Sequence, residues 1–383
     1  MTAIPLSLYI HVPWCVQKCP YCDFNSHQLK GGIPEAEYVA HLLDDLEADI
    51  PLISDGPKLR TIQSIFIGGG TPSLLSPYAM RTLLDGVKAR VPLAQDAEIT
   101  MEANPGTVES ERFSGFKQAG VNRISIGVQS FQPQHLKILG RIHDAQQASS
   151  AIAYAKDLNL RSFNTDIMHG LPEQSLENAL SDLRHSISAQ APHISWYQLT
   201  IEPNTLFHSK PPKLPEDDVL WDIQIAGAQL LAENGYEQYE ISAYAKTGHQ
   251  SQHNLNYWRF GDYLGIGCGA HGKITDTSDS SILRTEKVKH PKGYMDLSKP
   301  YMYKKHQVAD DDLAFEFFMN RFRLLEPCPV NEFEKCTGRR LNDEEQKRIN
   351  IAVDKGLLLE DNDVWQVSEL GRRYLNSLLS EFV

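Results

Sequence analysis

Three cysteines near the start of the chain have the types and spacing for metal chemistry. Cys15, Cys19 and Cys22 follow a C-x3-C-x2-C spacing, directly after an apolar, β-branched run in SLYIHVPW. Thiolates are the usual ligands of iron–sulfur clusters, and a short loop can aim three of them at one cluster. A cube held by three thiolates keeps one iron without a protein ligand, and an open metal position can bind a small molecule. The spacing therefore predicts chemistry at the cluster as well as electron storage.

Zinc is the main alternative metal for this loop. A zinc site needs a fourth Cys or a His, and His11 and His27 flank the loop. Disulfides are disfavoured, because nothing else in the chain indicates an oxidising compartment, and clustered cysteines in cytosolic proteins are more often metal ligands or catalytic groups. The other cysteines, at 268, 328 and 336, are scattered, and we interpret them as ordinary thiols.

An alternation of strands and helices must position this loop. Six short β-rich runs are expected at 8–12, 64–67, 98–102, 123–128, 162–168 and 193–199. Helical patterns at 38–52, 78–90, 145–158 and 176–189 lie between them. Such units imply right-handed crossovers and a parallel sheet. GGGTP is not a dinucleotide fingerprint, so the pattern favours an α/β fold with a partial, TIM-like (β/α)6 barrel.

Polar and glycine-rich residues follow each expected strand, where barrels of this kind carry functional groups. The turn containing Gly69, Gly70 and Thr71 would let the backbone approach a ligand closely. Four side chains after successive strands could converge on a ribose, an amino group and a carboxylate: Glu102, Gln129, Arg141 and Asp166. A tight turn explains the glycines equally well, and each polar residue alone is also compatible with an exposed loop.

The cysteine loop, with Tyr21 before its last Cys, resembles the radical S-adenosylmethionine (SAM) superfamily. In that family three Cys hold a [4Fe-4S] cluster, and the unligated iron chelates the amino and carboxylate groups of SAM. The block from Tyr9 to Asp166 resembles the branch that contains the oxygen-independent coproporphyrinogen III oxidase. The resemblance implies that eight residues bind SAM: Tyr9, Gly69, Gly70, Thr71, Glu102, Gln129, Arg141 and Asp166.

Two features depart from the oxidase. The oxidase has a fourth Cys where this chain has Phe24, and it has an extended segment before the position of Tyr9. Residues 253–257 read HNLNY, and this motif together with CPYCDF resembles the HemW family of haem chaperones. The match continues through TIEPNTLF and FEFFMNRFRLLE. The resemblance implies haem binding and transfer to respiratory haemoproteins, without coproporphyrinogen oxidase activity.

The HNLNY segment has its own chemical case for haem. Imidazole and phenolate are both axial ligands of haem iron, and His253 and Tyr257 are four residues apart, which places them on one face of a helix. Trp258 and Phe260 could supply apolar walls for a porphyrin. A packed aromatic connector is the competing interpretation. The resemblance favours haem, with His253 as the stronger ligand candidate.

Length and charge limit the classes of function. The 383 residues suit a large domain plus a smaller one, and the net charge of −12 argues against a nucleic-acid partner. No signal-peptide pattern and no apolar run of about 18 residues occur, so we expect a cytoplasmic protein. The resemblance adds peripheral contact with membrane-bound acceptors at the inner membrane, and a homodimer is compatible with it.

Three domains are expected. They are a radical SAM barrel over 1–205, a barrel extension with the HNLNY segment over 206–291, and a C-terminal domain over 292–383. Within the last, 292–312 is interpreted as a polar linker or a surface excursion, and helices are expected at 313–325, 343–355 and 372–379, with a hairpin before the last one. This α+β pattern resembles a winged helix. Few Lys or Arg lie on the hairpin, which favours a lid or docking role over DNA binding.

Two functions therefore compete. The leading one is a haem chaperone in which the cluster and SAM control release or docking. The alternative is an enzyme of the oxygen-independent coproporphyrinogen III oxidase type. A weaker third interpretation, radical chemistry on a tRNA base or a peptide, is disfavoured for the tRNA by the acidic balance.

Overall fold

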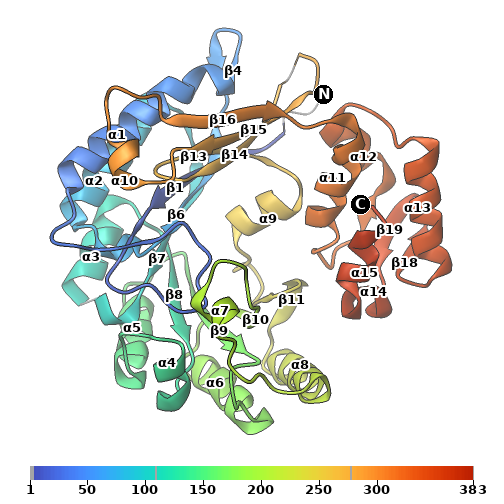
Figure 1. Ribbon diagram of the computed structural model, residues 1–383, viewed down its shortest axis with the longest axis horizontal. Coiled ribbons are helices and arrows are strands. Elements are labelled where there is room, and N and C mark those ends of the chain that lie inside the picture. The colour runs from blue at the N-terminus through green and yellow to red at the C-terminus, as the bar shows by residue number, and fades with distance from the viewer. Residues whose placement is uncertain (1–3, 108–109, 277, 383) are drawn as a thin grey trace.

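One twelve-stranded sheet forms the centre of the computed structural model, which describes residues 4–107, 110–276 and 278–382. The strand order is β11-β12-β10-β9-β8-β7-β6-β1-β13-β14-β15-β16. Six neighbouring strands are parallel: β1 (Leu6–Val12), β6 (Ile62–Gly69), β7 (Leu93–Ala103), β8 (Arg123–Gln129), β9 (Ser162–His169) and β10 (His193–Gln198). Figure 1 shows that the sheet is strongly curved. The predicted fold class is confirmed.

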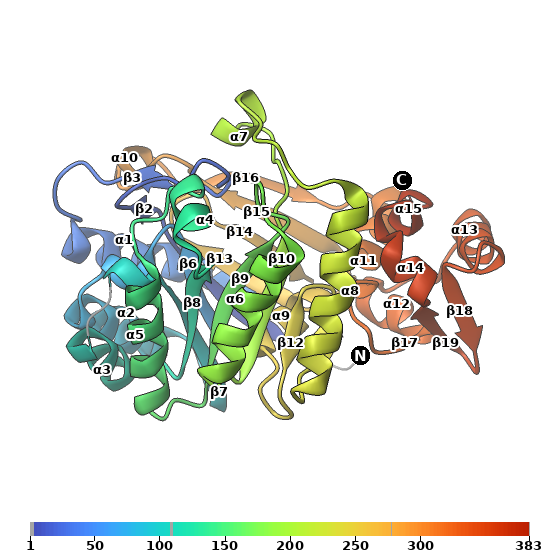
Figure 2. The ribbon, with the colours of Figure 1, turned by 90° about the horizontal axis from the view of Figure 1, so that it is seen from below.

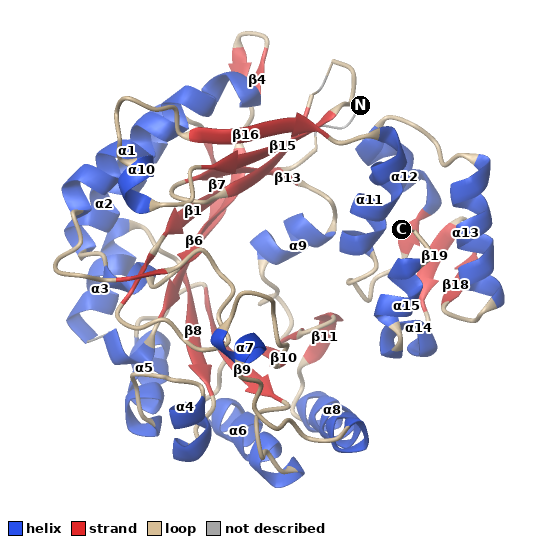
Figure 3. Ribbon diagram, in the orientation of Figure 1, coloured by secondary structure: helices blue, strands red, loops and turns tan. Residues whose placement is uncertain are grey.

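Helices cover the outer face of the curved sheet (Figure 3). They are α1 (Glu35–Asp49), α2 (Pro77–Arg90), α3 (Ser110–Ala119), α4 (Pro133–Ile138), α5 (Ala145–Asp157), α6 (Leu176–Ser188) and α8 (Asp217–Glu233). Local sequence explains where several begin. Ser76, Asp144 and Ser175 each accept a hydrogen bond from a backbone N–H in the first turn, which caps the helix. The four helices expected between the strands are confirmed.

Further strands extend the sheet on both sides. Beyond β10 lie β12 (Ala243–Ala245) and β11 (Glu237–Glu240). On the other side β13 (Asp262–Ile266) is parallel to β1 and is followed by the antiparallel strands β14 (His271–Thr275), β15 (Ile282–Lys287) and β16 (Met302–Gln307). The short helix α9 (Gln252–Trp258) lies in the interior of the curve (Figure 1).

Of the two interpretations of 292–312, the linker was wrong, because β16 lies within the segment, preceded by α10 (Pro291–Tyr294), whereas the surface position agrees with the exposed side chains of β16. Five of the six β16 side chains are exposed and the sixth is partly buried. An edge strand that faces solvent lacks the apolar alternation that identifies buried strands, and charged residues are common there. The strand is therefore specified by pairing with β15 rather than by its own composition.

The C-terminal segment packs around its own aromatic core. Its elements are α11 (Leu313–Arg321), β17 (Cys328–Pro329), α12 (Val330–Thr337), α13 (Asp343–Asp354), β18 (Leu358–Asp361), β19 (Val364–Val367), α14 (Glu369–Arg373) and α15 (Leu375–Ser380). Phe318 and Phe333 stack at the centre, with Trp365 edge-on to Phe318. The expected helices and hairpin are present, but Tyr374 divides the last helix into α14 and α15.

Several short elements complete the chain: β2 (Trp14–Cys15), β3 (His27–Gln28), β4 (Ser54–Asp55), β5 (Lys58–Leu59) and α7 (Leu206–Ser209). Figure 2 shows β2, β3 and α7 at the same edge of the molecule. None of the helices in the described ranges has both the length and the hydropathy that a membrane crossing requires.

A buried ion network joins the sheet extension to the first helix. Lys287 on β15 places Nζ 2.5 Å from Asp45 Oδ1 and 2.6 Å from Asp49 Oδ2 on α1. The Tyr294 hydroxyl donates to Asp45 Oδ2 at 2.7 Å. The Lys287 side chain is almost completely buried, so removal of its charge would leave two buried carboxylates without their cation.

We therefore predict that Lys287→Ala lowers the free energy of unfolding by about 3–5 kcal/mol, as measured by urea denaturation followed by circular dichroism. Lys304→Ala is the matched control, because the Lys304 side chain is 55 % exposed and should change stability by less than about 0.5 kcal/mol. Equal effects of the two variants would contradict a structural role for the network.

Candidate functional site

The cysteine loop leaves the carboxyl end of β1 and is tied down at both ends. Parallel pairing of β2 with β3 holds its two stems together. Within the loop, the Cys22 N–H donates to the Cys19 carbonyl at 3.2 Å, and the Phe207 N–H on α7 donates to the Pro20 carbonyl at 2.9 Å. Phe24, which stands where the oxidase resemblance would require Cys, is 58 % exposed.

The three thiols are partly buried and each is free of a disulfide. Thr71 makes a side-chain hydrogen bond to Cys15, and Arg141 Nη1 donates to Cys19 Sγ at 3.5 Å. Burial raises the pKa of Cys15 and Cys22, and the neighbouring thiols raise both further. The three sulfur atoms therefore lie close enough to influence one another electrostatically.

This donor set fits an iron–sulfur cluster. Three thiols come from one loop, and the guanidinium of Arg141 donates a hydrogen bond to the sulfur of Cys19. Among the described residues no three His, Cys, Asp or Glu side chains are already arranged as a metal site. His11 is not free to join them, because its ring nitrogens lie 2.7 Å from the Tyr9 hydroxyl and 2.9 Å from the Asn25 carbonyl.

The glycine turn after β6 packs directly on the end of β1. Gly69 has a φ of +109°, and a Cβ there would lie 2.4 Å from the ring of His11. A Cβ on Gly70 would lie 2.6 Å from the Trp14 carbonyl oxygen. Only glycine allows this approach. The Gly69 N–H also donates to Glu102 Oε2 at 3.1 Å, so the turn links the cysteine loop to β7.

Two carboxyl groups meet inside the barrel. Burial raises the pKa of Glu102 to about 8, and the nearby Asp166 raises it further. Asp166 accepts hydrogen bonds from Ser125 Oγ at 2.9 Å and from Asn164 Nδ2 at 2.7 Å. Within the described ranges neither carboxyl group forms an ion pair. This pair is suited to a ligand that brings positive charge or hydroxyl donors.

Gln129 and Arg141 lie at the same end of the sheet. Gln129 ends β8 with a φ of +69°, a left-handed conformation that residues other than glycine rarely adopt. It accepts a hydrogen bond from the Tyr197 hydroxyl at 2.7 Å. Arg141 Nη2 donates to the Gly127 carbonyl at 2.7 Å, while its other terminal nitrogen contacts Cys19. The predicted SAM-binding residues therefore gather around the strand ends and the cysteine loop.

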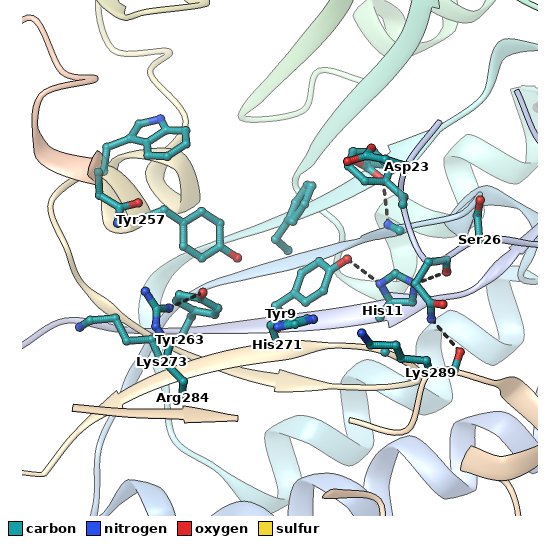
Figure 4. Close-up of a pocket in the computed structure, with 18 of the residues that line it drawn as sticks. Tyr9, His11, Asp23, Ser26, Tyr257, Tyr263, His271, Lys273, Arg284 and Lys289 are labelled. Atoms are coloured by element: carbon teal, nitrogen blue, oxygen red, sulfur yellow. Dashed lines mark hydrogen bonds between the residues drawn. The ribbon is translucent and has the colours of Figure 1, made fainter. Parts of the chain in front are cut away.

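A cavity of about 780 Å³ opens beside these strand ends (Figure 4). Tyr9, Gly69 and Glu102 line it on one side. An aromatic wall consists of Phe66, Tyr257, Trp258, Phe260 and Tyr263, and a basic wall consists of His271, Lys273, Arg284 and Lys289. The structure thus brings part of the predicted SAM site and part of the HNLNY segment to one cavity.

The two predicted haem ligands on α9 have different surroundings. Tyr257 lines the cavity, whereas His253 is 5 % exposed and stacks on Phe66 with ring centroids 4.1 Å apart. His253 Nδ1 lies 3.1 Å from Glu98 Oε1. Burial lowers the pKa of His253, although the neighbouring Glu98 acts to raise it. The lowered pKa favours the neutral ring at pH 7. The role of both residues as haem ligands stays a prediction.

Sequence reasoning missed two residues of this region. Tyr197 fixes Gln129 from β10, and His271 enters the cavity from β14. Tyr197 lies in an expected strand, but nothing local shows that its hydroxyl meets β8. His271 follows the glycine-rich run GIGCG, which could have indicated a tight backbone approach next to a ligand.

Comparison with known proteins agrees with this geometry. The profile of the Radical SAM superfamily matches residues 9–184, and that of the HemN C-terminal domain matches residues 308–374. A relative from Escherichia coli, named heme chaperone HemW, is 61 % identical over 379 residues, which cover 99 % of this chain and 98 % of the relative. The chain belongs to the HemW family of radical SAM proteins. Membership implies SAM and a [4Fe-4S] cluster.

Two further matches extend the comparison. A HemW-family relative from Haemophilus influenzae, also named heme chaperone HemW, is 56 % identical over 99 % of this chain and 98 % of its own length. The solved structure of coproporphyrinogen III oxidase (HemN) from Escherichia coli superposes with a TM-score of 0.83, covering 99 % of this chain and 90 % of that one. At 21 % identity the second match shows that the fold is shared.

The first site prediction concerns the cluster ligands. Cys19→Ser should abolish the visible absorbance and the bound iron obtained by anaerobic reconstitution, because a hydroxyl is a poor substitute for a soft thiolate. Cys336→Ser is the control, since Cys336 lies on α12 in the C-terminal segment. Retention of a full cluster by Cys19→Ser, measured as iron per chain, would contradict the assignment.

The second site prediction concerns Glu102. Its folded-state pKa of about 8 lies above the ordinary value of 4.5, so the folded chain binds the extra proton between roughly pH 5 and pH 8. Stability from this group is therefore lost as pH rises through that window. Glu102→Gln removes the effect, and the variant should exceed the wild type in unfolding free energy at pH 8 by on the order of 1–3 kcal/mol, with less difference at pH 5.

Urea denaturation at several pH values, without added ligand, measures this difference. Glu177→Gln is the control, because Glu177 is an exposed acid on α6. If Glu102→Gln and Glu177→Gln both showed the same pH dependence of the free energy of unfolding as the wild type, Glu102 would not be held protonated in the folded chain.

Proposed function

We propose that this chain is a haem chaperone. It binds haem in the cavity beside the cysteine loop and passes it to haem-accepting respiratory proteins, while SAM and the [4Fe-4S] cluster occupy the strand-end side of the same cavity. The observation that carries the proposal is the aromatic wall, which lines the same cavity as the predicted SAM-binding residues Tyr9, Gly69 and Glu102. The relatives named heme chaperone HemW support it.

The dimensions and chemistry of the cavity support haem as cargo. Its volume of about 780 Å³ lies within the range of roughly 300–1,000 Å³ typical of small-molecule and cofactor sites. A porphyrin is a flat aromatic plate with two carboxylates, so it needs apolar faces and cations at one edge. Phe66, Tyr257 and Trp258 provide the first, and Arg284 and Lys289 of the basic wall provide the second.

The two HNLNY residues enter the proposal differently. Tyr257 is already on the cavity wall and can contact a porphyrin without rearrangement. His253 would have to leave Phe66 and Glu98 before its ring could reach an iron atom. Ligation by His253 therefore requires a shift of α9 when haem enters.

Delivery is the second half of the proposal. A chain with a net charge of −12 is repelled by anionic lipid, so contact with membrane-bound acceptors is expected through the acceptor proteins themselves. The C-terminal segment, which has its own core, is the proposed docking module. Assembly as a homodimer belongs to the same proposal and is measured by light scattering of the reconstituted protein.

An anaerobic haem titration of the cluster-loaded protein tests the binding step. We predict a stoichiometric shift of the Soret band, and at least about a tenfold weaker affinity in Tyr257→Ala, because the ring of Tyr257 loses its contact with the porphyrin. Tyr303→Ala is the matched control, since Tyr303 is 68 % exposed on β16 and is not part of the cavity.

The outcome also separates the two leading functions. Absence of haem binding by the wild type would contradict the chaperone proposal. Formation of protoporphyrinogen from coproporphyrinogen III by the reduced, cluster-loaded protein would support the oxidase alternative, which Phe24 and the HemW-family membership disfavour.

A further inference from the structure

Three histidines line the cavity, and their ring nitrogens differ in availability. His11 has the Tyr9 hydroxyl 2.7 Å from Nδ1 and the Asn25 carbonyl 2.9 Å from Nε2. His27 Nε2 lies 3.3 Å from Asn25 Oδ1. Across the described ranges His271 makes no side-chain hydrogen bond through either nitrogen, although its ring is exposed to the cavity. His271 is therefore the cavity imidazole with both nitrogens open.

Strand pairing fixes His271 in place. It begins β14 and pairs with Glu286 of β15. A Cβ on Gly265 of β13 would lie 1.9 Å from the His271 carbonyl oxygen, so the two backbones touch. Figure 4 shows the His271 ring beside Tyr9 on the strand side of the cavity, with Tyr257 on the helix side. A porphyrin held between these sides would present its iron to His271.

His271 is also in the form that binds metal. Burial lowers the pKa of His271, and the positive charges of Lys289 and Arg284 add to this, whereas Glu286 acts in the opposite direction. The ring is therefore neutral at pH 7, with a lone pair available on one nitrogen. By contrast, the ring of His253 is committed to its contacts with Glu98 and Phe66.

The wall around His271 is suited to the carboxylate edge of haem. The Lys289 side chain is 61 % exposed, and the Lys289 Nζ lies 3.9 Å from Glu286 Oε2, its ion-pair partner among the described residues. Arg284 is less available, because it bonds Glu316 and donates to the Tyr263 hydroxyl at 3.0 Å. Lys289 is thus the more accessible cation of the basic wall.

We propose that His271 is an axial ligand of the haem iron and that Lys289 faces the propionate edge. The proposal rests on the haem chaperone function proposed above and names the ligand within that site. One imidazole nitrogen donates its lone pair to iron, so the step is a coordination without electron transfer. His253 of the HNLNY motif stacks on Phe66 and could act as a second ligand only after the shift of α9 described above.

Spectra of ferric haem complexes test this assignment. In His271→Ala we expect loss of the imidazole-type Soret band and an affinity lower by on the order of tenfold or more. Added free imidazole should restore the band, because it can occupy the space left by the ring. His306→Ala is the control, since His306 is an exposed residue of β16 outside the cavity and should leave the spectrum unchanged.

The other outcomes each contradict a distinct claim. If the wild type binds haem and His271→Ala keeps its spectrum and affinity, the ligand assignment is wrong and the chaperone function stands. If His271→Ala loses the band and imidazole fails to restore it, His271 has a structural role and the assignment is again wrong. If only His253→Ala lost the Soret band, the axial ligand would be His253 on α9. Absence of haem binding by the wild type would contradict both the ligand assignment and the chaperone function.

Discussion

The cavity depends on the position of β1 in the sheet. β1 lies between β6 and β13 and is parallel to both, so Tyr9 is in register with Phe66 on one side and Gly265 on the other. Residues from three distant segments thereby form one row along the cavity. Gly265 lets β14 approach closely enough to place His271 beside Tyr9. Because side chains alternate along a strand, a slip of one residue would turn Tyr9 away from the cavity.

The two ends of this cavity suit two kinds of ligand. Glu102 lines the end next to the cysteine loop, with Asp166 as its neighbour, and its carboxyl group, protonated in the free chain, can ionise against the positive charge of SAM. Arg284 and Lys289 provide a basic end next to the aromatic wall, which complements a flat dicarboxylate such as haem. In the proposed function the two ligands are neighbours, so the occupancy of one end is able to influence the affinity of the other.

Local patterns predicted the barrel and the cluster loop, because β-branched strands, helix caps and cysteine spacing are short-range signals. Structural features that depend on residues distant in the sequence could not be predicted from local patterns. β16 is exposed and polar from Lys304 onward, and it is specified by pairing with β15. The sequence singled out His253 and gave no comparable signal for His271. Phe66 and Glu98 enclose the first, while the turn before β14 exposes the second.

The most direct test of the central claim is anomalous diffraction at the iron edge from crystals of the cluster-loaded chain grown with haem. The account predicts two separate iron positions, one at Cys15, Cys19 and Cys22 and one in the cavity between Tyr257 and His271. A haem iron located outside this cavity, for example on the C-terminal segment, would contradict it.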